Sequence, residues 1–180
     1  MKQTKWFALA IALVLTFNAF GQEKSNVVKI NIFSPIVKTF NIAYERAISE
    51  NASLQGRFFY TGFKASDTKF SGFGITPEFR YYLSEAGVPK GGFIAPFVSY
   101  ASYSLEEEVT GSEATLTNIG GGVIIGAQAL MGPVTLEGFI GPQYISGSTK
   151  VDIGQEDDFD IGSSFDGFGV RVGVTIGIAF

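Results

Sequence analysis

The chain has 180 residues, with 13 Lys and Arg against 17 Asp and Glu, and it contains no His and no Cys. This acidity argues against a nucleic-acid partner, because phosphate binding requires clustered Lys and Arg. The missing Cys excludes disulfides and thiolate chemistry, and the missing His removes the commonest general base and metal ligand. The 23 Gly and 18 Phe, with only 17% charged residues, favour strands that bend and pack closely.

The first 21 residues predict a cleaved secretory signal peptide (1–21). Lys2 and Lys5 form a positive start, residues 6–17 an apolar core, and Ala-Phe-Gly at 19–21 a small-x-small cleavage site. The apolar run is shorter than the ~20 residues of a membrane-spanning helix, and no Cys beside the site could carry a lipid anchor. Cleavage would leave one domain, residues 22–180. Because the signal holds two of the 13 basic residues and none of the 17 acidic ones, the mature net charge is 11 minus 17, or −6.

Eight stretches of the mature chain alternate between large apolar residues and small or polar ones, which is the period of a β-strand. These predicted strands are residues 27–33, 38–48, 53–63, 72–83, 92–104, 115–130, 134–146 and 166–180. The fifth strand alternates less cleanly than the others. The sixth is rich in Gly and apolar on both faces, so its orientation stays open.

The last predicted strand has the clearest pattern. Seven apolar residues share one face: Phe168, Val170, Val172, Val174, Ile176, Ile178 and Phe180. The other face is small or polar and carries one charge, Arg171. A tilted strand needs only about 9–11 residues to cross the hydrocarbon of a membrane, so this strand could present a full apolar stripe to lipid. Paired with the first strand, it would close the sheet and remove its edges.

The predicted connections alternate in length. Those after the second, fourth and sixth strands are mostly short, whereas those after the third, fifth and seventh, at 64–71, 105–114 and 147–165, are longer and polar. The last two carry much of the acidic charge: Glu106, Glu107, Glu108, Glu113, Asp152, Glu156, Asp157, Asp158 and Asp160. This asymmetry is typical of an outer-membrane barrel with short periplasmic turns and longer extracellular loops. The short first outer connection, 34–37, and the longer turn at 84–91 fit that scheme less well.

Charge placement separates a membrane barrel from a soluble one. A soluble lipocalin-like barrel would turn its apolar face inward and a charged face to water. The polar strand faces of this chain carry mainly Gly, Ser, Thr, Asn and Gln, which is too little charge for a soluble surface. The one Trp, Trp6, lies in the predicted signal, so the Trp-containing strand typical of lipocalins is missing. We therefore expect an all-β, eight-stranded antiparallel up-and-down transmembrane β-barrel.

Six charged residues fall on the polar faces of the strands: Glu45, Arg57, Glu78, Arg80, Glu137 and Arg171. They are three acids and three bases, so their charges cancel. The interior of an eight-stranded barrel is only wide enough for side chains, so inward charges must pair with each other or with trapped water. We predict that the six form a lumenal ion-pair network in which Arg171 partners one of the acids; the alternative is that some are solvated at the rims. Lys29 and Arg46 fit the network less well, and Arg46 is expected at the membrane interface.

No catalytic, cofactor or metal site is predicted. An outer-membrane acyl-transfer enzyme needs a Ser–His pairing, which a chain without His cannot make. The carboxylates of Glu45, Glu78 and Glu137 are better explained as partners of Arg residues than as acid–base groups. Gly120–Gly122 lacks the Lys-Ser/Thr and the helix of a phosphate loop, and residues 157–160 lack the spacing of a calcium loop, so a solvated acidic loop is expected there.

The signal, the eight alternating strands and the terminal run 171–180 resemble the small outer-membrane barrels of the OmpX and OmpA-transmembrane type, over the whole mature length. This resemblance implies residence in the outer membrane of a Gram-negative cell, contact with its lipid, and a last strand recognised by the barrel-insertion machinery. The recognised positions would be Gly173, Ile176, Ile178 and Phe180. The runs Ile-Ala-Tyr-Glu-Arg (42–46) and Glu-Phe-Arg-Tyr-Tyr (78–82) also resemble an uncharacterised family of short exported barrel proteins, for which no activity is implied.

The sequence therefore predicts a monomeric, non-enzymatic outer-membrane barrel with a structural or surface-interaction role, whose acidic loops face an extracellular partner. Two alternatives stay open. One is a narrow pore for small solutes, although a filled lumen argues against conduction. The other is a secreted soluble lipocalin-like barrel that binds an apolar ligand. Fold alone does not distinguish these roles.

Overall fold

The computed structural model describes residues 25–65, 68–84, 87–107, 113–153 and 166–180, which form a closed antiparallel barrel in the order β1 to β8. The elements are β1 (Asn26–Asn31), the 3-10 helix η2 (Ser34–Val37), β2 (Thr39–Ala47), β3 (Ala52–Ala65), β4 (Thr68–Tyr82), β5 (Gly91–Glu107), β6 (Glu113–Met131), β7 (Val134–Ile153) and β8 (Gly167–Ala179). The predicted fold class is confirmed. Within these ranges, no helical segment has the length and apolar composition of a membrane span. The predicted signal peptide lies outside the described residues.

Strands β1 and β8 close the barrel, as the sequence predicts. Val27 pairs with Ala179, and the backbones of Asn26 and Phe180 exchange hydrogen bonds of 3.0 and 2.9 Å. Hydrogen-bonded partners can be followed once around the barrel through Val27, Glu45, Gln55, Glu78, Phe97, Gly122, Gln143 and Gly169. This path ends ten residues before Ala179. A shear of ten over eight strands tilts the strands by about 40° and leaves an interior that side chains fill.

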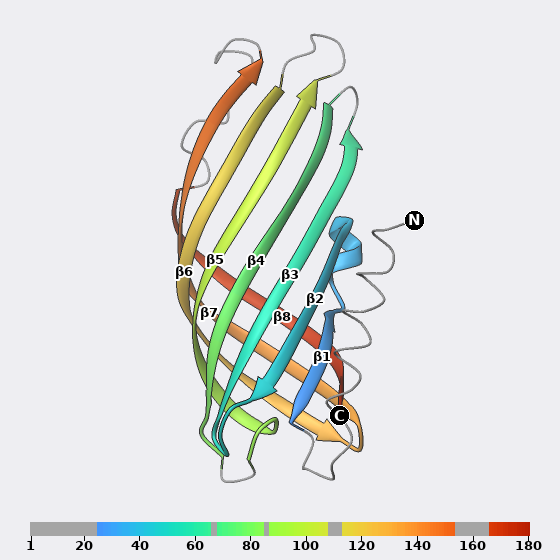
Figure 1. The fold of residues 1–180 in the computed structure, drawn as a ribbon, viewed down its shortest axis with the longest axis vertical. Helices are drawn as coiled ribbons and strands as arrows, with labels where there is room; N and C mark the ends of the chain where they lie inside the picture. The colour runs from blue at the N-terminus through green and yellow to red at the C-terminus, as the bar shows by residue number, and fades with distance from the viewer. Residues whose placement is uncertain (1–24, 66–67, 85–86, 108–112, 154–165) are drawn as a thin grey trace, which may run out of the picture.

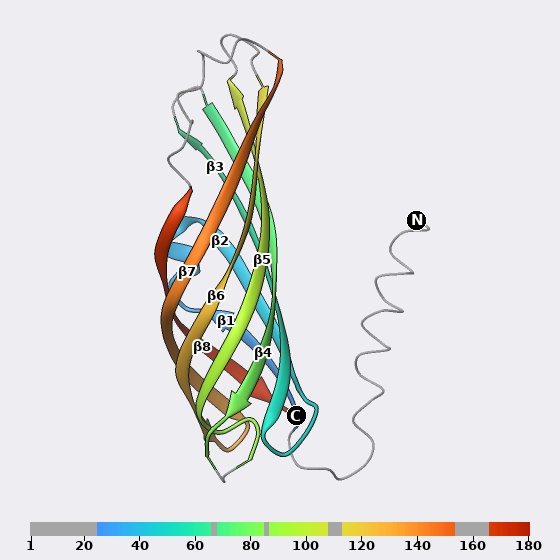
Figure 2. The ribbon, with the colours of Figure 1, turned by 90° about the vertical axis from the view of Figure 1, so that its left-hand side faces the viewer.

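The hairpin between β3 and β4 is tight where the sequence predicts a loop. β3 ends at Ala65 and β4 begins at Thr68, and Lys64 pairs with Lys69 within the ladder. The prediction of a polar loop at 64–71 is therefore wrong. Figure 1 shows that β3 to β7 rise well above the top of β1 and β2, and Figure 2 shows the same tall, twisted barrel from the side.

The other two predicted long loops are also shorter than expected, because strands occupy part of them. β5 continues to Glu107 and β6 begins at Glu113, inside the predicted loop 105–114. β7 extends to Ile153, inside the predicted loop 147–165. Residues that are polar on both faces suggested loops, yet a strand that projects beyond the lipid has water on its outer face and keeps its backbone hydrogen bonds. In these strands, the change to polar residues therefore indicates where the strand leaves the membrane. It does not indicate where the strand ends.

The outside of the barrel is apolar. Large apolar side chains remain exposed on every strand, at positions that alternate with buried ones. Examples are Ile30, Phe40, Phe58, Ile75, Val98, Ile125, Ile140 and Val172. A soluble barrel has the reverse arrangement, with its apolar side chains around an internal ligand. The alternative of a secreted lipocalin-like barrel is therefore wrong.

Strand β6 turns most of its Gly residues toward the lumen. Ile125 faces outward, whereas Gly122 and Gly126 face inward opposite Phe97 and Phe93 of β5. A Cβ at Gly126 would collide with the ring of Phe93, and a Cβ at Gly122 would collide with the backbone oxygen of Pro142 and crowd the ring of Phe97. Gly at these positions lets two large rings lie inside a narrow barrel. This settles the orientation that the sequence leaves open for the sixth strand.

Two further positions require glycine, one for its backbone conformation and one for close packing. Gly132 has φ 63° in the short turn between β6 and β7, a left-handed conformation in which a Cβ is unfavourable. Gly173 of β8 faces inward, and a Cβ there would collide with the ring of Phe139 on β7. The lumen is thus packed by Phe rings that lie against Gly residues of neighbouring strands.

The seam between β1 and β8 covers only the lower part of β8. In the described chain, β1 pairs with residues 175–179, and one further bond joins Ile32 N to Val174 O at 3.2 Å. β7, in contrast, pairs with β8 from Gly167 onward. Phe168, near the top of β8, is accordingly 89% exposed. On this side, the upper part of β8 bounds the lumen. Among the described residues it is hydrogen-bonded to β7 along one edge only.

Candidate functional site in the barrel lumen

All six charged residues that the sequence predicts inside the barrel face its interior. Five are buried and Arg171 is partly buried: Glu45, Arg57, Glu78, Arg80, Glu137 and Arg171. Each lies on the strand face opposite the exposed apolar residues, because side chains alternate along a strand. Lys29 of β1 joins them. We call these seven residues the lumenal ion cluster.

Arg80 of β4 lies at the centre of the cluster. Its guanidinium donates two hydrogen bonds to Glu137 of β7, from Nη1 to Oε2 at 2.7 Å and from Nη2 to Oε1 at 3.0 Å. Nη2 also donates to Glu78 Oε2 at 2.9 Å, and Nη1 lies 3.6 Å from Glu45 Oε2. The side chain is fully buried, so these carboxylates compensate its charge in place of water.

Lys29 is a full member of the cluster, which corrects the expectation that it fits the network poorly. Its Nζ donates to Gln128 Oε1 at 2.5 Å, lies 2.5 Å from Glu45 Oε2, and pairs with Glu137. Its side chain is completely buried. The signal was present in the sequence, because Lys29 sits on the strand face opposite the apolar Ile30.

Neutral side chains complete the hydrogen bonding around Glu45. Its Oε1 accepts from Ser53 Oγ and from Tyr82 OH, each at 2.6 Å. Gln128, which contacts Lys29, also donates from Nε2 to Pro89 O at 2.7 Å. These contacts satisfy polar groups that would otherwise be buried without partners. Sequence reasoning missed them because the side chains carry no charge, although they share the inward face of their strands.

Glu78 is shared by three arginines. Its Oε2 accepts from Arg80 and, at 2.8 Å, from Gln55 Nε2. Its Oε1 faces Arg57 Nε at 3.4 Å and Arg171 Nη2 at 3.5 Å, both long contacts. Glu78 is therefore the acid with which the structure pairs Arg171.

Phe rings pack against three of the guanidinium groups. The centroid distances are 4.5 Å for Arg80 over Phe93, 4.5 Å for Arg171 over Phe97, and 4.9 Å for Arg57 over Phe139. At these distances the rings attract and orient the cations. Because β5 contributes Phe93 and β6 contributes Gln128, side chains of all eight strands meet at the cluster.

The charges of the cluster do not balance. It contains four cations and three carboxylates among the described residues. Two cations and two carboxylates form its lower part, whereas Arg57 and Arg171 share Glu78 in its upper part. Every carboxylate is held by at least two cations, which leaves none uncommitted for acid–base chemistry. In the described part of the chain, His, Cys, Asp and Glu side chains form no group of three or more that could hold a metal ion.

The predicted assembly residues lie along β8. Ile176 and Ile178 face outward, Gly173 faces inward, and Phe180 follows the strand at the lower rim. Arg46 is exposed on the outer face near the same rim. The four predicted assembly residues therefore occupy both faces of the strand that closes the barrel.

Most acidic residues of the predicted loops lie outside the described residues, namely Glu108, Glu156, Asp157, Asp158 and Asp160. Glu106 is described and belongs to β5. Its carboxylate pairs with Lys69 Nζ of β4 at 3.1 Å, and about half of each side chain is exposed. This ion pair lies in water, in contrast to those of the lumen.

A closed barrel with an apolar exterior is suited to a bilayer, because its backbone groups pair between strands and lipid cannot hydrogen-bond to an open sheet edge. Most of the charged side chains in its interior form ion pairs with one another. These features define the protein as an eight-stranded outer-membrane β-barrel. The chain belongs to the family described as "Protein of unknown function (DUF3575)", whose model matches residues 7–152.

The chain is similar to several solved structures. The crystal structure of Neisserial surface protein A (NspA) is 17% identical, with a TM-score of 0.52, over 87% of this chain and 94% of that one. A major outer membrane protein from Thermus thermophilus is 13% identical, with a TM-score of 0.44, over 87% and 98%. Acinetobacter baumannii CarO2 is 10% identical, with a TM-score of 0.39, over 87% and 96%. A comparison with curated protein sequences finds no match. The likeness to NspA supports the barrel fold.

Proposed function

We propose that this protein is a monomeric, non-enzymatic outer-membrane barrel with a structural or surface-interaction role, whose lumen is closed to solutes by the lumenal ion cluster. The observation that carries the proposal is the meeting of side chains from all eight strands at the cluster. For example, the side chain of Arg80 on β4 crosses the interior and hydrogen-bonds to Glu137 on β7. A conducting lumen needs polar side chains that solvate a passing solute, whereas these are committed to one another.

Apolar side chains packed against the ion cluster add a second obstacle in the lumen. Tyr82, Phe93, Ile124 and Phe139 form one buried cluster with neighbouring Ala and Phe side chains. Solutes that pass through the barrel would have to displace this packed cluster as well as the ion pairs. The narrow-pore alternative therefore requires a large rearrangement of the interior.

The chemistry of the side chains supports a role without catalysis. The three lumenal carboxylates, Glu45, Glu78 and Glu137, each accept hydrogen bonds or ion pairs from cations. A carboxylate held in this way is a poor general base, and the chain has no His or Cys to replace it. The inference is independent of what the loops bind.

The partners that we propose follow from the last strand, the acidic connections and the apolar exterior of the barrel. The last strand, ending in Phe180, would present the signal that the insertion machinery recognises during assembly. The acidic connections after β5 and β7 would face outside the cell and suit a partner with positive charge. Lipid would cover the apolar exterior.

Cell fractionation combined with gel migration of unheated and heated samples tests membrane residence and barrel closure together. We expect the protein in the outer-membrane fraction after a carbonate wash, with a faster unheated band that reflects the compact barrel. Recovery in the aqueous fraction without detergent, or equal migration of both samples, would contradict the proposal.

A further inference from the structure

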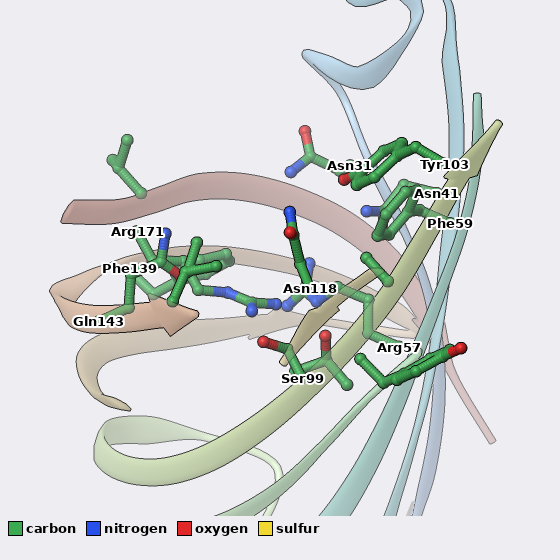
Figure 3. Close-up of a pocket in the computed structure, with 15 residues that line it drawn as sticks. Asn31, Asn41, Arg57, Phe59, Ser99, Tyr103, Asn118, Phe139, Gln143 and Arg171 are labelled. Atoms are coloured by element: carbon green, nitrogen blue, oxygen red, sulfur yellow. The ribbon is translucent and has the colours of Figure 1, made fainter. Parts of the chain in front are cut away.

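A cavity of about 290 Å³ lies in the lumen above the lumenal ion cluster (Figure 3). Six of its polar lining residues come from six different strands: Asn31, Asn41, Arg57, Asn118, Gln143 and Arg171. Figure 3 shows these side chains converging on a common space. The proposed closure of the lumen does not use this space, which lies on the upper side of the cluster.

Positive charge is in excess at this cavity. Arg57 and Arg171 both line it, and Glu78 is the carboxylate that faces both of them. One oxygen of Glu78 is already taken by Arg80 and Gln55, and the other is 3.4 Å or more from either cavity arginine. A buried cation whose charge is partly compensated is unfavourable, so an anion in the cavity would be stabilised.

Polar atoms at the cavity also need partners. Arg57 Nη2, Asn41 Oδ1 and Asn118 Oδ1 are buried without a hydrogen-bond partner among the described residues. Arg57 is 5% exposed and Asn118 is 9% exposed. A guanidinium N–H requires an acceptor, and an amide oxygen requires a donor. The set therefore fits a ligand that carries an anionic acceptor together with O–H or N–H donors.

Aromatic rings hold the two arginines for such a ligand. Phe139 covers the guanidinium of Arg57, and Phe97 covers that of Arg171. Each ring restrains its guanidinium, whose hydrogen bonds are made in the plane of the group, through its N–H edges. That planar fork matches the two oxygens of a carboxylate.

We propose that the cavity binds a small monoanionic carboxylate that also carries a hydroxyl group. Its carboxylate accepts hydrogen bonds from Arg57 and Arg171, and its donor group pairs with Asn41 or Asn118. A single negative charge matches the one excess positive charge of the cluster. This site goes beyond the proposed function, because binding in the upper lumen requires no passage through the ion cluster.

Lactate is a suitable probe, since it has one carboxylate and one hydroxyl. The mature protein would be unfolded by urea in detergent micelles with increasing sodium lactate, at ionic strength held constant with sodium chloride. We expect a saturable rise of the unfolding midpoint, because a ligand at 100 times its Kd lowers the unfolding constant by about 100-fold. Acetate, which lacks the donor, should stabilise less, and neutral methyl lactate should not stabilise.

Two variants and one control locate the effect. Arg57→Gln and Arg171→Gln each remove the excess charge and should weaken lactate binding by about tenfold or more, the effect of a lost hydrogen bond to a charged group. Lys38→Gln removes an exposed cation outside the lumen and should bind lactate as the wild type does. The proposal is overturned if lactate stabilises no better than sodium chloride, if either Arg variant responds like the wild type, or if methyl lactate is as effective as lactate. None of these results depends on whether the barrel conducts.

Discussion

Replacement of Glu137 by Gln tests the lumenal ion cluster most severely. Glu137 accepts hydrogen bonds from Arg80 at 2.7 and 3.0 Å and pairs with Lys29, and all three side chains are fully buried. The neutral amide keeps the shape of the side chain but removes the charge that compensates two cations. Breaking a buried ion pair from one side costs about 3–5 kcal/mol, because the remaining charge stays buried without its partner. At about 1.4 kcal/mol for each factor of ten, the unfolding constant should rise by two to three and a half orders of magnitude.

Urea titration of protein refolded into lipid vesicles measures this change. The folded fraction is read from the faster migration of unheated samples, because the one Trp, Trp6, lies in the predicted signal and residues 22–180 contain no Trp. Glu106→Gln is the matched control, since Glu106 pairs with Lys69 at 3.1 Å on the exposed upper strands. An exposed pair contributes less than about 1 kcal/mol. If Glu137→Gln and Glu106→Gln shift the free energy of unfolding equally, the buried cluster does not stabilise the barrel as argued.

Three further predictions concern the cluster, the packing of the lumen and assembly. Adding Lys29→Met to Glu137→Gln should recover part of the lost stability in the same urea titration, because it removes one of the two buried cations whose charge Glu137 compensates; a further loss would contradict the pairing. Gly173→Val should destabilise the barrel by about 1–3 kcal/mol through overpacking, whereas Gly138→Val, where a Cβ meets nothing within 4 Å, should change little. Phe180→Ala should lower the amount of protein in the outer membrane of cells but leave the stability of refolded protein within about 1 kcal/mol. Equal losses in both assays would assign Phe180 a purely structural role.

The period-two alternation was sufficient to predict the barrel and its inward charges, because it determines which face of a strand each side chain occupies. Arg171 illustrates this, since its place among apolar neighbours predicted a lumenal position and an acidic partner. Strand ends were not predictable in the same way. The polarity of Lys64 and Lys69 predicts a loop, although the two residues pair within a strand ladder that extends beyond the lipid.

The candidate site was less predictable than the fold, because its contacts depend on the shear of the barrel. Alternation puts Lys29 on the polar face of its strand, but its contact with Gln128 joins residues 99 positions apart in the chain. A displacement of neighbouring strands by two residues would give both different partners. The same applies to Asn41 and Asn118, whose convergence at the upper cavity no pattern along the chain indicates.

Conductance across a planar lipid bilayer tests the central claim, that the lumen is closed by its own side chains, most directly. Purified wild-type protein, folded by the criterion of gel migration, would be added to a bilayer at a constant applied voltage. The lumenal ion cluster and the rings packed against it predict no current steps above those of a protein-free bilayer. Reproducible, ohmic current steps from the wild type would contradict a closed lumen and would favour the narrow pore.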